Sequence, residues 1–575
     1  MSMIFSRRNA DLILLHAPSI YDFRKVANLL GPISDVIPST PVFEMYPVGF
    51  SSLAEYLGAH NVSVRIINLA YRMLSNPGFD VEKTIRKLRP KAFGIDLHWL
   101  PHAHGSVEIA KICKKYHPTV PVIFGGYSAT YFHRELLDYH EIDFVIRGDS
   151  TEESLHQLMR QVGDGGQDFE QIPGLSWRHP ERGIVENPMP DPPESLNQYM
   201  NNYVNLFKMA IRFRDIKSLT AIHDWWRYPI TAVLTCRGCT ENCAICGGSK
   251  YALKHYGNRR QPSYRDPALI VQDILNIGRF TRAPIFVIGD LNQPGEWYAN
   301  QILSGLKKRP VKNQIVFELF NPSKEDYFKD LGDAGINFNF EMSPESHAYE
   351  VRKAAGKFYK NEDMENNIKW ALENGCQKFD IFFMIGLPEQ TSDSVLETVE
   401  YCEYLLGKFG KRVVPFISPL APFLDPGSLA YENPDAYGYR ILFHKFEDYR
   451  RALLKPSWKY MLSFETRWLD REAILQLTYE AGKRLSRIKH KFGLIDDAAL
   501  ATILNKIDIA LKKHQQIAQS YEGNEAAFER ELEFQLQTDM RIDSMATICG
   551  KEEIKWPSAA QNFKFLNIAR AILFD

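Results

Sequence analysis

Two stretches of the chain alternate short apolar runs with segments of helical periodicity, and this alternation limits the fold more than any other feature. The first stretch, residues 11–162, contains the strand candidates DLILLHAP, VRIINL, KAFGIDLHW, PVIFGG and IDFVIRGD. Helical segments such as VGFSSLAEYLGAHN and SVEIAKICKKYH separate them. Strands that alternate with helices of this length are typical of a parallel, doubly wound sheet. The sequence therefore predicts an α/β domain over residues 1–162.

The second stretch, residues 228–430, repeats the alternation. Its strand candidates are ITAVLT, IFVIGD, QIVFELF, INFNFEM, KFDIFFMIG and VVPFIS, and helical segments separate most of them. This pattern predicts a partial or complete β/α barrel, in which catalytic groups gather at the carboxyl ends of the strands. Between the two stretches, residues 163–227 predict a small hairpin with its turn at residues 181–183, a proline-rich linker and one helix.

Residues 431–575 carry amphipathic periodicity and no evident strand signal, which predicts a helical C-terminal domain. Between Lys483 and Lys513 the chain has eight Lys or Arg residues and three Asp residues. A basic amphipathic stretch can lie on an anionic membrane surface, so peripheral membrane contact is one hypothesis. The alternative is that the apolar face packs on the barrel and water solvates the charges.

Composition narrows the class of protein. The 575 residues include 69 Lys or Arg and 70 Asp or Glu, so the net charge is -1, which gives no support for a nucleic-acid partner. No apolar run reaches the ~18 residues of a membrane-spanning helix. The first residues, MSMIFSRRNADLILLHAPS, do not have the pattern of a signal peptide. We therefore expect a cytoplasmic protein.

Four of the eight cysteines fall in one short run, C-x2-C-x3-C-x2-C, formed by Cys236, Cys239, Cys243 and Cys246. Zinc sites built from two close pairs normally separate the pairs by a dozen or more residues. A bacterial ferredoxin run orders its spacings differently and ends in proline, whereas Gly247 follows here. The third interpretation uses only Cys239, Cys243 and Cys246, which would hold three irons of a [4Fe-4S] cluster and leave the fourth iron open.

The segment RGCTENCAIC resembles the cluster loop of the radical S-adenosylmethionine (SAM) enzymes. The resemblance implies a [4Fe-4S] cluster whose open iron is chelated by the amino and carboxylate groups of SAM. An electron from the reduced cluster then cleaves SAM to methionine and a 5'-deoxyadenosyl radical, which abstracts hydrogen from a substrate carbon. Ile245 departs from the pattern, since this position is often aromatic in the family. We expect Cys236 to be a buried thiol behind the cluster, with a role as alternate ligand or redox partner as the alternative.

Two later segments resemble SAM-binding parts of the same family, namely FEMSPES at residues 340–346 and FMIGLPEQT at residues 383–391. The resemblance places SAM against the glycines after the cluster loop, against the fourth barrel strand and, through a bidentate ion pair, against an arginine. It places the adenine at the later strand and turn. Each charged residue could instead be a solvated surface charge, and no catalytic residue is assigned. The predicted SAM contacts are Gly247, Gly248, Glu341, Ser343, Arg352, Gly386 and Pro388.

The N-terminal region resembles the vitamin B12 (cobalamin)-binding domain that is fused to many radical SAM enzymes. YPVGFSSLAEYLGAHNVSVRIINL, PVIFGGYSAT and IDFVIRGDSTEESLHQLM carry the resemblance, which with the barrel covers roughly residues 10–430. It implies a corrinoid at the strand carboxyl ends, facing the cluster, with Gly125 and Gly126 lining the channel for the nucleotide tail. The alternative is a degenerate domain that only shapes the substrate channel.

This sequence departs from the cobalamin-binding family at two positions that bear on how the cobalt is bound. The D-x-H-x-x-G loop that supplies a lower axial histidine in some cobalamin enzymes is absent, since the segment after the first strand reads HAPSIYDFRK. The S-x-L element reads Asp96-Leu97-His98. His98, His102 and His104 crowd the next loop. Histidine is a competent metal ligand, but we expect these three to be solvated or hydrogen-bonded.

Together these features predict a cobalamin-dependent radical SAM enzyme that methylates an unactivated carbon. They most resemble an archaeal and bacterial subgroup with a TCRGCTENCAICGGS-type cluster loop and a PLAPFLDPGS segment. The alternative is radical C–C bond or ring formation on a lipid or other substrate without methyl transfer. A non-enzymatic Fe-S or corrinoid-binding regulator is a weaker alternative. The expected partners are a small-molecule or lipid substrate and an electron donor such as flavodoxin or ferredoxin.

Overall fold

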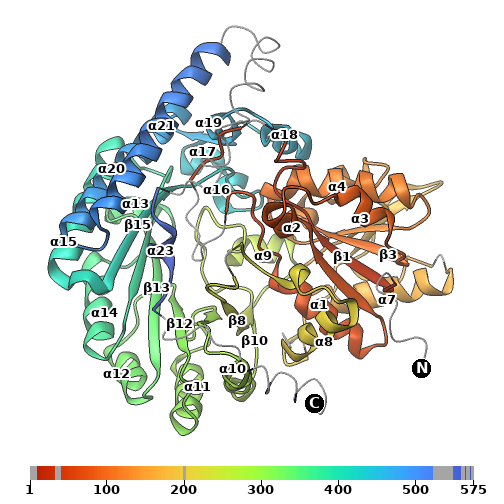
Figure 1. Ribbon diagram of the computed structural model, residues 1–575, viewed down its shortest axis with the longest axis horizontal. Helices are drawn as coiled ribbons and strands as arrows, with labels where there is room; N and C mark the ends of the chain where they lie inside the picture. The colour runs from red at the N-terminus through yellow and green to blue at the C-terminus, as the bar shows by residue number, and fades with distance from the viewer. Residues whose placement is uncertain are drawn as a thin grey trace.

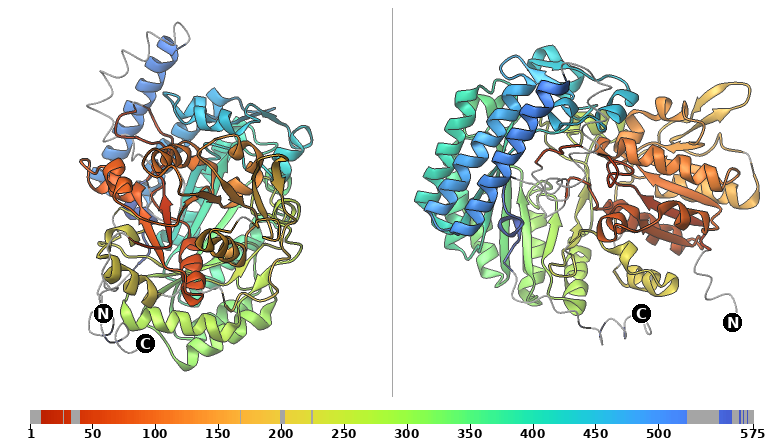
Figure 2. Two further views of the ribbon diagram at one scale, coloured as in Figure 1. Left: turned by 90° about the vertical axis from the view of Figure 1, so that its right-hand side faces the viewer. Right: turned by 45° about the horizontal axis from the view of Figure 1, so that its top comes forward.

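Two parallel sheets form the body of the protein, and the N-terminal sheet lies against one side of the barrel (Figures 1 and 2). The computed structural model describes residues 9–26, 28–32, 40–166, 168–198, 203–223, 225–521 and 548–557, with the single residues 564, 567 and 570.

The N-terminal sheet has seven strands in the order β2-β1-β3-β4-β5-β6-β7. The first five strands are parallel, while β6 and β7 add antiparallel at one edge. The strands are β1 (Leu12–His16), β2 (Val64–Asn68), β3 (Ala92–Asp96), β4 (Val122–Gly125), β5 (Phe144–Ile146), β6 (Leu175–His179) and β7 (Gly183–Glu186). The order 2-1-3-4-5 is that of doubly wound, flavodoxin-like sheets, which bind ligands at the carboxyl edge where β1 and β3 meet. The predicted α/β fold is confirmed.

Helices cover both faces of this sheet. Every residue of β1, β2 and β3 is buried, as expected for parallel strands that are covered on both sides. The covering helices are α1 (Val48–Ala59), α2 (Leu69–Ser75), α3 (Val81–Arg86), α4 (Ala103–Tyr116), α5 (Tyr127–Tyr131), α6 (His133–Leu137) and α7 (Glu152–Asp164). The predicted hairpin is the pair β6–β7, so it extends the sheet. Helix α8 (Tyr203–Phe213) leads from there toward the barrel.

The second sheet has six parallel strands in the order β15-β14-β13-β12-β11-β8. They are β8 (Thr231–Leu234), β11 (Ile285–Ile288), β12 (Gln314–Leu319), β13 (Asn337–Glu345), β14 (Phe379–Ile385) and β15 (Val413–Pro419). Among the described residues β15 does not pair with β8, so this is a partial barrel. Its outer face carries α10 (Pro267–Phe280), α11 (Glu296–Lys308), α12 (Glu325–Asp333), α14 (Asn361–Glu373) and α15 (Ser392–Phe409) (Figure 1).

The region after the barrel is mainly helical, as predicted. Helix α20 (Arg471–Lys491) packs on α15, on β15 and on α21 (Asp497–Tyr521). The expectation that residues 431–575 contain no strand is wrong, because β16 (Tyr439–Ile441) and β17 (Phe464–Thr466) form a small antiparallel pair. A strand of three residues is too short to show a period of two. The helix predicted in NFKFLNIARAILFD lies largely outside the described residues.

Ion pairs occupy much of the basic stretch in α20 and α21. Lys483 pairs with Asp508 at 2.6 Å, and Lys491 pairs with Glu403 at 2.6 Å. Further pairs join Arg484 to Glu480 and Lys489 to Glu553. Because these acids offset the basic charges, the geometry favours packing on the barrel over attraction to an anionic membrane. None of the helices that the structure describes is both long and apolar enough to cross a membrane.

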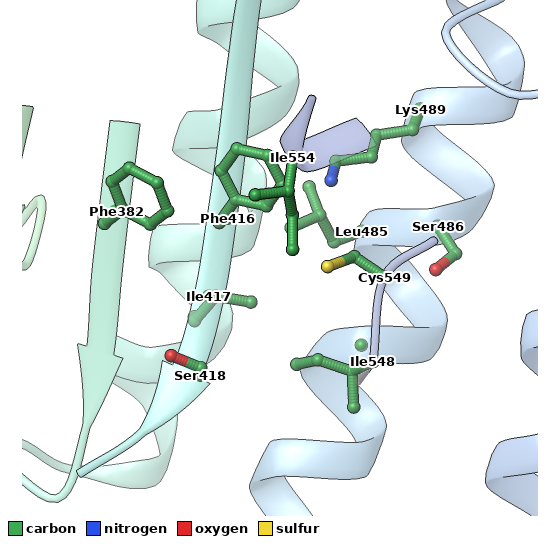
Figure 3. Close-up of a pocket in the computed structure, with 11 residues that line it drawn as sticks. Phe382, Phe416, Ile417, Ser418, Leu485, Ser486, Lys489, Ile548, Cys549 and Ile554 are labelled. Atoms are coloured by element: carbon green, nitrogen blue, oxygen red, sulfur yellow. The ribbon is translucent and has the colours of Figure 1, made fainter. Parts of the chain in front are cut away.

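A C-terminal segment that includes α23 (Lys551–Ile554) and Trp556 fills the face of the barrel sheet opposite to its helices. The Trp556 ring stacks on Phe286 with centroids 5.5 Å apart, and its Nε1 donates to Glu341 Oε1 at 2.7 Å. Ile554 packs on strands β14 and β15 beside α20 (Figure 3). The cavity left there measures about 20 Å³, room for about one water molecule. This segment therefore closes the inside of the barrel.

Candidate functional site

The four clustered cysteines lie at the carboxyl end of β8, where barrel enzymes place their chemistry. Cys236 belongs to a two-residue strand, β9 (Cys236–Arg237), which pairs with β10 (Ser263–Tyr264). The loop then runs to α9 (Lys250–Tyr256), whose first turn is capped by the Ser249 hydroxyl. The cysteines therefore lie in a loop that is held at both ends.

The three predicted cluster ligands lie close enough to influence one another's charge. Cys239 Sγ accepts hydrogen bonds from Glu241 N at 3.4 Å and Gln293 Nε2 at 3.5 Å, and Cys246 Sγ accepts one from Gly248 N at 3.3 Å. Burial raises the pKa of the Cys243 thiol to about 11. Three thiolates here need a compensating positive charge, which bound irons supply. Donors aimed at the sulfurs also tune Fe–S clusters, so these residues fit a [4Fe-4S] cluster.

The zinc interpretation fits less well. Among the described residues, no group of three His, Cys, Asp or Glu side chains converges on a single metal ion. A mononuclear zinc site requires such convergence. A four-iron cluster does not, because each thiolate binds its own iron. The loop geometry therefore favours the cluster.

Cys236 lies behind the cluster loop, with 8% of its surface exposed. A Cβ added at Gly289 would lie 2.8 Å from its sulfur, so the thiol is tightly enclosed. Burial raises the pKa of this thiol, as it does for the cluster cysteines, so the enclosure by Gly289 is what distinguishes Cys236. This position agrees with the expected buried thiol.

The turn after α13 (Tyr349–Ala354) packs against the backbone of the cluster loop. Ala244 N donates to the Ala355 carbonyl at 2.9 Å. Gly356 has φ +95°, and a Cβ there would lie 2.6 Å from the Asn242 carbonyl oxygen. The loop can adopt this position because residue 356 has no side chain.

We expect Gly356→Ala to lower the iron content after anaerobic reconstitution, because the new methyl group would displace the loop between Cys239 and Cys243. Gly375→Ala is the matched control. Gly375 has φ +99°, yet a Cβ there meets nothing within 4 Å. Both variants bear the strain of a positive φ, about 1–2 kcal/mol. Equal iron content in the two variants would contradict the proposed contact with the cluster loop.

Two predicted SAM contacts are buried in structural bonds. Arg352 is fully buried and donates to the carbonyls of Ser346 and Tyr359 at 2.8–3.0 Å. Glu341 accepts from Trp556, and burial together with neighbouring carboxylates raises its pKa well above the usual value. Neither residue is a solvated surface charge. A contact between either residue and SAM stays a prediction, and it would require these bonds to break.

The end of β13 brings a lysine to the cluster loop. The register of β13 against β14 shifts between Met342 and Glu345. Glu345 pairs with Lys357 at 2.8 Å, and Lys357 also donates to the carbonyl of Ser343, a predicted SAM contact. Burial alone would lower the pKa of Lys357, but the Glu345 carboxylate outweighs it and raises that pKa. The ammonium lies near Cys243, so it adds positive charge beside the cluster thiols.

The other predicted SAM contacts lie at the same edge of the barrel. Gly386 has φ +101° and donates its N–H to Gln390 Oε1 at 2.7 Å, at the end of β14. Pro388 is buried in the turn that follows. Gly248 N binds Cys246 Sγ, and Gly247 N donates to Asp425 Oδ2 at 3.0 Å. Their contacts with SAM stay predictions.

One carboxylate joins the cluster loop to the N-terminal domain. Asp425 accepts from Gly247 N with Oδ2 and from Trp99 Nε1 with Oδ1, both at 3.0 Å. Trp99 follows β3, at the carboxyl edge of the N-terminal sheet. Gly427 lies near by, since a Cβ there would meet the Tyr127 hydroxyl at 3.4 Å. The carboxyl edges of the two sheets therefore meet at the cluster loop.

Two arginines strengthen this contact. Arg237, between Cys236 and Gly238, pairs with Glu152 at 2.5 Å, and Glu152 is only 2% exposed. Arg259 pairs with Asp149. Sequence reasoning missed these two arginines and Asp425, because each acts on a partner far away in the chain. It also missed Lys357, whose position beside Cys243 depends on the fold. Asp425 lies within the PLAPFLDPGS segment, which was the available signal.

The predicted glycine pair lies at this same edge. Gly125 ends β4, pairs with Asp96 of β3, and has no neighbour closer than 3.9 Å to an added Cβ. Gly126 has φ +111°, and a Cβ there would lie 2.6 Å from the His98 backbone. Gly126 therefore packs on β3, whereas Gly125 faces open space at the edge, where a bound group could approach.

Comparison with known protein families agrees with this arrangement. Residues 34–156 match the B12 binding domain, and residues 233–402 match the radical SAM superfamily. The chain joins a B12-binding domain to a radical SAM domain. These domains imply a [4Fe-4S] cluster, SAM and cobalamin as cofactors. The chemistry of the cysteine loop fits the cluster, and the open Gly125 edge fits the corrinoid.

The chain is similar to several methyltransferases. The hopanoid C-3 methylase of Methylococcus capsulatus is 22% identical over 48% of this chain, and the chain spans about half (49%) of that protein's length. An uncharacterized methyltransferase of Pyrococcus horikoshii is 24% identical over 66% of this chain and 78% of its own. Among solved structures, the radical SAM methyltransferase TsrM from Kitasatospora setae, with cobalamin and a [4Fe-4S] cluster bound, aligns with TM-score 0.57. That alignment has 15% identity and covers 92% of this chain and 99% of TsrM, and it supports the fold.

Proposed function

We propose that the protein is a cobalamin-dependent radical SAM methyltransferase that methylates an unactivated carbon of a small-molecule or lipid substrate. The observation that carries the proposal is the Trp99–Asp425–Gly247 link, which brings the carboxyl edge of the B12-binding domain to the cluster loop. When bound, the reduced cluster supplies the electron that cleaves SAM, and the corrinoid supplies a methyl carrier. The names of the similar methylases support this assignment.

The chain's own residues bind and position these groups. Cys239, Cys243 and Cys246 hold the cluster, and the Asp425 carboxylate fixes the loop that carries them. The Arg237–Glu152 and Arg259–Asp149 pairs hold the two domains together and limit the entry of water between them. An electron donor such as flavodoxin or ferredoxin supplies the electron to the cluster.

The proposed domain boundaries follow the sequence. They are 1–162 for the B12-binding domain, 163–227 for the hairpin and linker, 228–430 for the radical SAM barrel and 431–575 for the C-terminal domain. The pairing of β5 with β6 supports adding the hairpin to the first unit. The TCRGCTENCAICGGS loop and the PLAPFLDPGS segment support the archaeal and bacterial subgroup. The Asp425 contact gives the second segment a physical role there.

Cofactor analysis tests the proposal. Protein made in a cobalamin-replete host and purified anaerobically should contain both cobalt and iron. With SAM and a reductant it should form 5'-deoxyadenosine and, with substrate, a methylated product. Deoxyadenosine without methyl transfer would favour C–C bond or ring formation. A cluster that never cleaves SAM would favour a regulator, and absence of cobalamin would overturn the proposal.

A substitution at the sheet edge separates the two cofactors. We expect Gly125→Trp to reduce cobalt content strongly and to leave iron content unchanged, because the new ring would occupy the open edge above β4. Gly126 is unsuitable for this test, since any side chain there collides with β3. Gly183→Trp is the control, because Gly183 lies in the hairpin and an added Cβ meets nothing within 4 Å. Equal cobalt content in both variants would contradict a corrinoid at this edge.

A further inference from the structure

Histidines surround one buried carboxylate at the carboxyl edge of the B12-binding domain. Asp96 ends β3, and both of its oxygens lie 3.1 Å from His16 Nδ1 at the end of β1. The Oδ2 atom also lies 2.7 Å from His98 Nδ1. β1 and β3 are neighbours in the sheet, at the point where doubly wound folds bind their ligands. The three histidines of the loop after β3 are expected to be solvated or hydrogen-bonded, and each makes a hydrogen bond. His102 and His104 are buried at the start of α4, and His98 is partly exposed.

Hydrogen bonds fix the positions of these side chains. His16 Nε2 lies 3.0 Å from the Phe43 carbonyl, which can only accept, and His16 Nδ1 faces the Asp96 carboxylate. His16 therefore holds the Asp96 carboxylate in place. Both side chains are buried, with exposures of 0% and 4%. A carboxylate stabilised in this way accepts a further hydrogen bond from His98 Nδ1.

This arrangement leaves a lone pair on the other nitrogen of His98. Because Nδ1 donates to Asp96, Nε2 is the ring nitrogen whose lone pair can bind a metal. No hydrogen bond to Nε2 occurs among the described residues, and 32% of the side chain is exposed. The His102 ring, 4.9 Å away between centroids, limits rotation of the His98 ring. A histidine that is oriented by a carboxylate through one nitrogen is the usual form of a protein metal ligand.

The neighbouring histidines are not available for the same role. His102 is 1% exposed, and its Nδ1 lies 3.0 Å from the Ala17 carbonyl. His104 is 5% exposed, and its Nδ1 accepts from Tyr21 N at 3.2 Å. His98 therefore differs from them by having both access and a free nitrogen. It also lies beside the glycine pair, because Gly126 packs on its backbone.

We propose that His98 Nε2 is the protein ligand to the cobalt of the bound corrinoid, with Asp96 as the residue that positions it. This inference rests on the proposed cobalamin binding. The ligand comes from the loop after β3, in place of the loop after β1 that supplies the histidine in D-x-H-x-x-G proteins. Trp99, the next residue, donates to Asp425 and thereby ties this loop to the cluster loop. The cobalt would then lie between the sheet edge and the radical SAM domain.

Electron paramagnetic resonance of the cob(II)alamin form tests the ligand directly. Histidine labelled with nitrogen-15 is incorporated into the protein, and cobalamin of natural isotopic abundance is supplied. A nitrogen-15 ligand splits each cobalt line into two, whereas nitrogen-14 splits it into three because its nuclear spin is larger. We expect two lines. Three lines would show that the cofactor's own base is the ligand, and absence of splitting would show no nitrogen ligand. Either result would overturn the inference.

Two variants identify the histidine. His98→Asn keeps an amide N–H near the position of Nδ1 and removes Nε2, so we expect the two-line splitting to disappear. His156→Gln is the matched control. His156 is another partly buried histidine beside a carboxylate, Glu153, and it lies with Asp11 and Lys91 at the opposite edge of the sheet. It should keep the two-line splitting. A two-line spectrum in His98→Asn would assign the ligand to another histidine and overturn the proposal.

The spectrum also separates this inference from the proposed function. Protein that holds no cobalamin contradicts both. Protein that holds cobalamin and transfers methyl groups, but shows no splitting from labelled histidine, contradicts only the role of His98. The wild-type spectrum decides between these results, so they do not depend on whether the His98→Asn variant folds.

Discussion

Replacing Cys239, Cys243 or Cys246 with alanine should abolish the [4Fe-4S] signal and the formation of 5'-deoxyadenosine. Each substitution removes one of three protein thiolates. Loss of an outer-shell partner alone costs about 10- to 100-fold in metal affinity, so loss of a ligand should cost more than about 100-fold in activity. Iron content, the visible absorbance of the reconstituted cluster and deoxyadenosine yield measure the effect.

Cys236→Ala is the matched control for this series. Its thiol is buried and enclosed beside Gly289, behind the cluster loop, so its removal should leave both signals largely intact. The ligand assignment is tested by comparing the Cys236 variant with the variants of the three predicted ligands. A Cys236 variant without a cluster, together with a Cys246 variant that keeps its cluster, would reverse the ligand assignment.

Trp556→Ala should destabilise the barrel strongly. Trp556 is 2% exposed, stacks on Phe286 and donates to Glu341. Removal of a buried Trp side chain costs about 3–5 kcal/mol, and a buried carboxyl group that loses its donor adds about 1–3 kcal/mol. The midpoint of thermal unfolding, followed by circular dichroism on the purified chain, should fall accordingly.

Two further variants separate packing from the hydrogen bond. Trp556→Phe keeps an aromatic ring against Phe286 and loses the N–H donor. Its midpoint of thermal unfolding should therefore lie between those of the wild-type chain and Trp556→Ala. Trp297→Ala removes a ring that is 54% exposed and should change the midpoint little. If Trp556→Ala and Trp297→Ala behaved alike, the C-terminal segment would not contribute to barrel stability.

The sequence predicts those parts of the fold in which strands and helices alternate regularly. Strands and helices of ordinary length alternate twice, and both parallel sheets are confirmed. The pair β16–β17 has no such pattern, since each strand has three residues. Insertion of Trp556 between Phe286 and Glu341 could not be predicted either. It joins residues more than 200 positions apart, and no local pattern marks such a contact.

The candidate site divides in the same way. The cysteine loop is a short local motif, and its position at the end of β8 is confirmed. Asp425 and Arg237 act across the domain interface, so their roles emerge only from the folded chain. The basic residues of α20 and α21 suggest a positively charged surface when only the local sequence is considered. The acids that pair with its lysines include Glu403 and Glu553, which lie outside the basic stretch.

The contact between Glu341 and Trp556 also sets the timing of folding during synthesis. The two residues are 215 positions apart. A ribosome that adds roughly 5–20 residues per second needs roughly 10–40 s to make Trp556 after Glu341. During that interval Phe286, and later Phe382 and Phe416 once they have been made, lack their C-terminal cover on the inner face of the barrel sheet. The nascent chain therefore exposes an apolar surface that chaperones can bind until the C-terminal segment with α23 and Trp556 is made.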